Sequence, residues 1–149
     1  MNKCLFLFFL FFKTNFYSQV TSQNDVDSLT TYYVHKADSL IRINDFKGAI
    51  VKYSEALNEN ADKLRIYKKR SIAYLADKDY ENAILDYNKI IEIVKSSEKL
   101  ANEYFYRGLC KIMLNKPGDD TCEDLMKAKE HGFEAEWSSF SIFCSNIAN

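Results

Sequence analysis

Glycine and proline are scarce in this chain, with four glycines and one proline among 149 residues. Both residues mark tight turns and loops, so their scarcity argues against many short strands and favours long helices. Hydrophobic residues make up 47% of the sequence, which is too many for a chain that stays disordered. A chain of this length forms one domain of ordinary size. We therefore expect a single all-α domain.

The chain also lacks an excess of charge of one sign. Its formal net charge is −1 at pH 7, so no overall field attracts nucleic acid or an anionic membrane. We expect no nucleic-acid partner. Membrane contact is expected only through the apolar N-terminus, if that segment is retained.

Catalytic and metal-binding motifs are missing as well. His35 and His131 are the only histidines, and a metal site needs three or four convergent ligands. Two isolated histidines and widely spaced cysteines do not supply them. The phosphate-binding patterns GxxxxGK[ST] and GxGxxG and the zinc pattern HExxH do not occur. We therefore expect no enzyme, no metal and no cofactor.

The N-terminus begins "MNKCLFLFFLFFKTNFYSQ" and contains an apolar run of eight residues, Leu5–Phe12. A membrane-spanning helix needs about 20 residues, whereas a short apolar run after an early lysine is typical of a secretory signal peptide. We predict a signal peptide over 1–18, a polar linker over 19–28, and export to the periplasm or secretion. The alternatives are an apolar helix of the domain and an uncleaved anchor.

A repeat is what the sequence does contain. "NDFKGAIVKYSEAL" at 44–57 returns as "KDYENAILDYNKII" at 78–91, 34 residues later. A period of this length indicates stacked supersecondary units. Asp120, with Glu123 three residues later, is expected to cap a helix. The apolar periodicity predicts helices over about 28–42, 46–58, 62–76, 80–94, 98–115, 120–131 and 134–146.

The repeated residues resemble the tetratricopeptide repeat, a 34-residue helix–turn–helix unit. Ala49 and Ala83 match the family's mid-repeat alanine, and Thr121 takes that position in a less regular third repeat. Further matches are Tyr33, Tyr67, Tyr104, Tyr53, Tyr87, and the small residues Ala37, Ser71 and Gly108. The resemblance implies an α-solenoid of three hairpins, over about 29–61, 62–96 and 98–131, with a capping helix at 134–146.

The resemblance also implies a function, that of a small exported bacterial protein of this family. Such a protein is non-enzymatic and binds a protein or an extended peptide along the concave face of its first helices. By register, the groove residues would be Asp38, Arg42, Arg65, Lys68, Ile72, Phe105 and Leu109, with Val34 beside them. Some family members hold a C-terminal carboxylate with Lys and Asn, but Val34 and Asp38 occupy those positions here, so we do not expect that clamp.

Two alternatives to a peptide groove stay open. The charged helix faces can be ordinary solvated surface. The protein can also be a structural scaffold of the cell envelope that assembles with itself and takes no peptide ligand.

The cysteines give a geometric prediction. The helices over 120–131 and 134–146 form a hairpin that turns near 132–133, and Cys122 and Cys144 lie at nearly equal distances from this turn. Residues equidistant from the turn of an antiparallel pair lie side by side, and export places them in an oxidising compartment. We predict a disulfide between them, and many exported proteins of the resembling family carry cysteines at these places. Cys110 mirrors to Leu125 and is expected to be a small buried thiol.

Overall fold

The computed structural model describes residues 27–59, 62–94, 100–115 and 118–147. In these ranges all regular structure is helical, in seven helices. A first helix covers residues 27–42. It is followed by α2 (Phe46–Asn58), α3 (Lys63–Ala76), α4 (Tyr80–Val94), α5 (Ala101–Met113), α6 (Asp119–Glu130) and α7 (Trp137–Ile147). The signal peptide and most of the linker that the sequence predicts lie outside the described residues.

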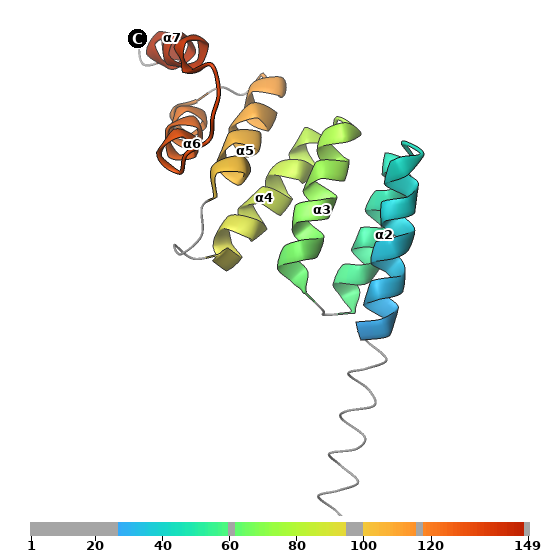
Figure 1. Ribbon diagram of the computed structural model, residues 1–149. Coiled ribbons are helices and arrows are strands. Elements are labelled where there is room, and N and C mark those ends of the chain that lie inside the picture. Colours follow the sequence, from blue (N-terminus) through green and yellow to red (C-terminus); the bar gives the residue numbers. More distant parts are fainter. Residues whose placement is uncertain (1–26, 60–61, 95–99, 116–117, 148–149) are drawn as a thin grey trace, which may run out of the picture.

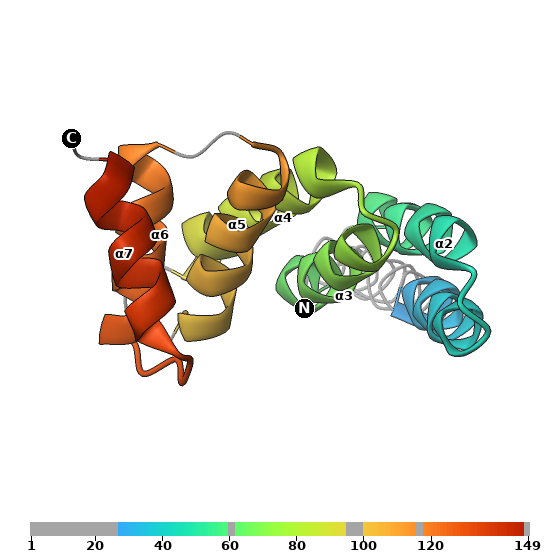
Figure 2. The same cartoon turned by 90° about the horizontal axis from the view of Figure 1, so that it is seen from above.

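The helices form antiparallel hairpins that stand side by side in one row. Figure 1 shows the row running from the first helix and α2 through α3 and α4 to α5 and α6, with α7 at its end. The view from above in Figure 2 shows the same order. The expected architecture, an α-solenoid of three hairpins with a C-terminal helix, is therefore confirmed.

The turns within the first two hairpins share the same backbone conformation and the same type of helix cap. Asn44 and Lys78 adopt left-handed backbone conformations, with φ of 60° and 62°. The aspartate that follows each of them caps the next helix: Asp45 Oδ1 accepts the Gly48 N–H at 2.9 Å, and Asp79 Oδ1 accepts the Asn82 N–H at 3.3 Å. The repeated "ND" and "KD" of the sequence thus encode both the reversal and the start of the second helix.

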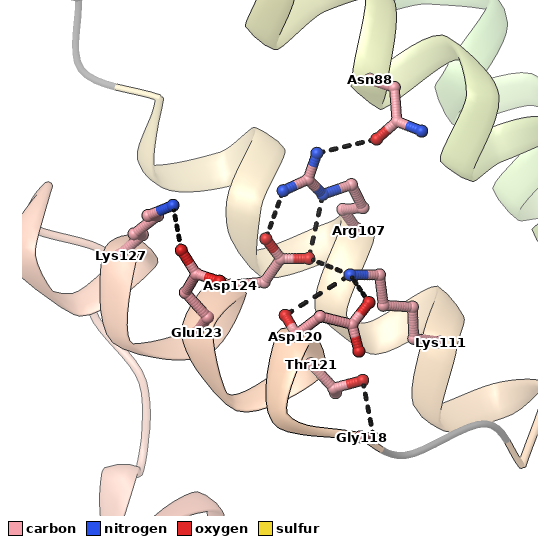
Figure 3. Close-up of polar contacts among 9 residues, drawn as sticks. All are labelled: Asn88, Arg107, Lys111, Gly118, Asp120, Thr121, Glu123, Asp124 and Lys127. Carbon is pink, nitrogen blue, oxygen red and sulfur yellow. Dashed lines mark hydrogen bonds and ion pairs between the residues drawn. The ribbon is translucent and has the colours of Figure 1, made fainter.

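The third hairpin departs from the predicted helix ends. The α5 helix starts at Ala101. It ends at Met113, and the chain then turns at Asn115, whose backbone is left-handed with φ of 51°. The predicted cap at Asp120 is wrong. The helix begins one residue earlier, and Thr121 Oγ1 accepts the N–H of Gly118 (Figure 3). Asp120 instead forms an ion pair with Lys111 at 2.7 Å.

Two buried clusters join the hairpins. In the first, Ala49 and Tyr53 of α2 pack with Ile66 and Ala73 of α3. In the second, Ala83 and Tyr87 of α4 pack with Cys110 of α5. Ala49 and Ala83 are both fully buried, so the repeated alanines occupy equivalent places. Because each cluster includes residues of two neighbouring hairpins, the stacking of hairpins contributes to the buried core.

Small residues let the helices of each hairpin approach closely. Ala37 and Ser71 are 0% and 1% exposed. A Cβ placed on Gly108 would lie 3.4 Å from atoms of Asp124 and Leu125. These three positions hold the small residues that the resemblance to the tetratricopeptide repeat matched.

A polar ladder, which the sequence did not reveal, also links the hairpins. Arg70 of α3 donates to Asp86 of α4 at 2.7 and 2.8 Å and to Ser54 of α2 at 2.8 Å. One hairpin later, Arg107 of α5 binds Asp124 of α6 through two nitrogens and donates to Asn88 of α4 at 2.7 Å (Figure 3). Each arginine thus ties its own hairpin together and joins it to the preceding one.

The end of the row is closed by α7. A disulfide joins Cys122 of α6 to Cys144 of α7, with the Cα atoms 5.6 Å apart. This is the pairing that the mirror arrangement predicts. Phe133 stacks on Phe105 of α5 with ring centroids 3.9 Å apart, and Trp137 and Phe140 meet the same ring edge-on. Cys110 is free and buried, as expected.

Candidate functional site

Two adjoining hollows lie along the first helices of the first two hairpins. The first hollow, of about 360 Å³, is lined by Asp38, Ile41, Arg42, Tyr53, Lys69 and Ile72. The second hollow, of about 300 Å³, is lined by Asp62, Leu64, Arg65, Lys68, Lys69 and Ile72. They share Lys69 and Ile72 and so form one continuous surface. Five of the seven predicted groove residues line it, namely Asp38, Arg42, Arg65, Lys68 and Ile72.

Asp38 is held by partners from two other helices. Tyr53 donates its hydroxyl to Asp38 Oδ1 at 2.5 Å, and Lys69 donates to both carboxylate oxygens at 2.9 and 3.0 Å. Burial opposes the charged form of Asp38, but the bonds from Tyr53 and Lys69 outweigh it, so the pKa of Asp38 is lowered. Burial, together with the bond to Asp38, raises the pKa of Tyr53. Asp38 therefore stays ionised and joins the first helix to α3.

The cations of the surface differ in how far they are neutralised. Lys69 is bonded to Asp38. Arg65 pairs with Asp62 at 3.3 Å, and Lys68 pairs with Glu103 of α5 at 3.1 Å. Arg42 donates to the hydroxyl of Ser39 and has no carboxylate partner among the described residues. Its guanidinium is thus the cation of this surface that remains available to an incoming acid.

Ile72 gives the surface an apolar contact. Its side chain is 59% exposed between the two hollows, with Arg42 lining the first of them and Lys68 the second. An exposed isoleucine on a helix is unremarkable alone. Beside unpaired positive charge it makes a surface that suits a ligand carrying both an acidic and an apolar side chain.

Two of the residues expected in the groove serve the stacking of hairpins instead. Val34 is 3% exposed and packs in the first buried cluster, so its placement in the groove was wrong. Phe105 packs against the rings of the capping region rather than standing open. Val34, Lys68 and Phe105 share one repeat position, and Lys68 there bonds to α5. This position points at the next helix along the row, which the sequence register alone did not reveal.

Leu109 is half-buried on α5 and lines neither of the two hollows. Conversely, four residues that line the hollows were not identified as site residues from the sequence, namely Tyr53, Asp62, Leu64 and Lys69. Tyr53 was only matched to an aromatic position of the repeat. The signal that could have identified Lys69 is its place one helical turn before Ile72 on the same face.

The described part of the chain contains no group of three or more side chains able to hold a metal ion. None of its helices combines the length and apolarity needed to cross a membrane. Burial raises the pKa of the Cys110 thiol to about 11, so this cysteine is not an activated nucleophile.

Known proteins add to this description. No protein-family model matches the chain. Over 79 residues, 53% of its length, the chain is 30% identical to tetratricopeptide repeat protein 12 of Homo sapiens. The repeat is tetratricopeptide-like. The chain is also 34% identical over 70 residues, 44% of its length, to sperm-associated antigen 1 of Mus musculus. It spans only 11% and 8% of the lengths of these two relatives.

A tetratricopeptide-like solenoid is in general a scaffold for protein interaction and is typically non-catalytic. The similarity covers about half of the chain, and the arrangement of stacked hairpins fits it.

Proposed function

We propose that this protein is a non-enzymatic interaction module that binds an extended segment of another protein across the two hollows. One observation carries the proposal: Arg42, which has no carboxylate partner in the described residues, and Ile72, which is 59% exposed, line the same hollow. A ligand with an acidic side chain for Arg42 and an apolar side chain for Ile72 satisfies both.

The fixed side chains around these two residues support an extended ligand. Asp38 and Tyr53 are locked by their mutual bond and by Lys69, so the first hollow keeps its shape before a ligand arrives. A preformed surface loses less conformational entropy on binding. Arg65 and Lys68 line the second hollow but are paired with Asp62 and Glu103, so the main site for an acidic side chain of the ligand is Arg42 in the first hollow.

The proposed setting is the periplasm or the outside of a bacterial cell, after removal of residues 1–18. The apolar run near the N-terminus and the Cys122–Cys144 disulfide support it, since disulfides persist in oxidising compartments. Intact mass of the protein recovered from the envelope fraction tests this. A mature chain that begins near Gln19 is expected, and recovery of the full-length chain in the cytoplasm would contradict it.

Selection from a library of displayed peptides tests the binding surface. Enriched peptides are expected to combine an acidic residue with an apolar one. Arg42→Glu and Ile72→Ser are each expected to weaken their binding at least about tenfold, as for residues at the centre of an interface.

The controls match these changes elsewhere on the chain. Lys89→Glu changes a charge on α4, and Leu85→Ser changes an α4 side chain that is also 59% exposed. Both are expected to leave binding unchanged. Equal losses in the control and test variants, or no enriched peptide, would remove the hollows as the site.

A further inference from the structure

The N-terminal edge of the solenoid carries a second surface. It consists of the exposed side chains of Tyr32, His35, Lys36 and Ser39 on the first helix, and of Ile43 just after it. Tyr32 is 59% exposed and Ile43 is 71% exposed. The ring of Tyr32 meets that of Tyr33 edge-on at 5.5 Å, so this aromatic side chain is supported by a neighbour.

Two of these repeat positions, those of Tyr32 and Ser39, are buried in the later hairpins. Tyr32 corresponds to Ile66, which is 0% exposed, and to Glu103, which is 8% exposed. Ser39 corresponds to Ala73 and Cys110, which are fully buried. Ile66 and Ala73 are covered by residues of the preceding hairpin. At Tyr32 and Ser39, the edge therefore exposes positions that the preceding hairpin covers farther along this chain.

The edge also carries a cation, Lys36, for which the described residues supply no carboxylate. Lys36 corresponds to Arg70 and Arg107, each of which binds an aspartate of its own hairpin and an oxygen of the preceding one. In the first hairpin the position of that aspartate is taken by Lys52, which pairs with Glu55 at 2.7 Å. Within the described residues Lys36 has no acidic partner.

We propose that the N-terminal edge binds an amphipathic α-helix of a partner protein. The helix lies where a preceding hairpin would lie, places apolar side chains on Tyr32 and Ile43, and offers a carboxylate to Lys36. The ladder farther along the row supports both parts of this proposal, because there a helix covers the same face and an oxygen acceptor meets the same cation. This surface differs from the hollows, which Arg42 and Ile72 line.

A synthetic peptide tests the proposal on the full chain. The probe is an amphipathic helix of about 18 residues, with leucine and isoleucine along one stripe and glutamate beside it. Its control carries lysine at every glutamate. Amide chemical shifts of the labelled protein locate the bound peptide, and fluorescence anisotropy measures its affinity. The glutamate peptide is expected to shift the amides of residues 32–43 and to bind more tightly than the lysine peptide.

Substitutions at the edge sharpen the test. Lys36→Glu is expected to weaken binding of the glutamate peptide about fivefold, as for an exposed ion pair. Tyr32→Ala is expected to weaken it about tenfold, as for an aromatic anchor. Lys89→Glu on α4 serves as the control with unchanged affinity, and circular dichroism checks that each variant keeps its helices.

Each remaining outcome decides against the proposal. Equal affinity for both peptides, shifts confined to other helices, or no binding by the full chain would overturn it. A doubling of mass in light scattering that disappears in Tyr32→Ala would assign the edge to a second copy of this chain instead.

Discussion

The helices of the first hairpin cross over Ala37 and Ala49, both fully buried, with Tyr53 filling the space beside them. In the third hairpin the corresponding positions hold Gly108 and Thr121. The first hairpin thus closes through apolar contacts at the crossing. The third hairpin has less apolar volume there and carries more polar bonds around it.

The first and third hairpins also differ in their charged residues. The first hairpin has Lys36 and Lys52 where the third has Arg107 and Asp124. Asp124 is 1% exposed and is bonded to both Arg107 and Lys111. One backbone unit is therefore stabilised in two ways, by small apolar residues at one end of the row and by a buried ionic network at the other.

The two ends of the row also meet solvent differently. The third hairpin is closed by α7, a disulfide and stacked rings. The first leaves Tyr32 and Ile43 exposed. Stacked repeats need covered ends for solubility. Among the described residues, one end of the row is covered and the other leaves apolar side chains exposed. Four experiments measure how much each difference contributes to stability.

The largest effect is expected at the buried network of the third hairpin. Asp124→Ala leaves Arg107 and Lys111 without their shared carboxylate, and removing one partner of a buried ion pair costs about 3–5 kcal/mol. Urea unfolding followed by circular dichroism measures the loss. Glu123→Gln, which removes an exposed pair with Lys127, is expected to cost less than about 1 kcal/mol. Similar losses in both variants would show that burial of the network is not what matters.

The disulfide is expected to rank second. Replacing Cys122 and Cys144 together by serine frees a loop with a sequence separation of 22, which in the chain-entropy model costs about 3 kcal/mol. Loss of protection in α7, measured by hydrogen exchange, is expected to exceed that in the first helix.

Thiol titration after denaturation checks the bond itself. Cys122→Ser is expected to raise the free-thiol count by one, because Cys144 loses its partner. An unchanged or lower count would contradict the disulfide.

A smaller effect is expected from introducing into the first hairpin the cation–aspartate pair that the other two hairpins have. Lys52→Asp places a carboxylate at the position that Asp86 and Asp124 hold in the other hairpins. We expect a coupling energy with Lys36 of about 0.5–1 kcal/mol, the range of partly exposed pairs. A double-mutant cycle with Lys36→Ala isolates this energy. No coupling would mean that the first hairpin does not bring these positions together as the others do.

The smallest effect concerns pH. The pKa of Asp38 is lowered below its ordinary 3.8, mainly by Tyr53 and Lys69 acting against burial. A carboxyl with a lowered folded-state pKa contributes stability that is complete above its unfolded pKa and disappears as the pH falls through the folded one. The contribution of this half-exposed group is expected to stay below about 1 kcal/mol. In Asp38→Asn, the free energy of unfolding should change less with pH than in the original protein, and only below about pH 4. Urea unfolding at several pH values measures this dependence. A change at neutral pH alone would contradict this assignment.

The sequence by itself determined the helices and their order. The predicted bounds of α2 and α4 agree with the structure, because apolar periodicity and an aspartate cap act over a few neighbouring residues. The pairing of Cys122 with Cys144 followed from counting along antiparallel helices, and the small residues at the crossings followed from the resemblance to the tetratricopeptide repeat. All of these depend on local spacing, which a sequence records directly.

Only the tertiary structure decided which side chains meet across hairpins. Arg107 and Asp124 lie 17 residues apart, and nothing in their local sequence separates them from exposed charges. Phe105 was expected to be open because its helix face was known but the direction to the next helix was not. Contacts of this kind depend on how closely and at what angle whole hairpins stack, and that is set by the sum of many packed side chains rather than by any single stretch of sequence.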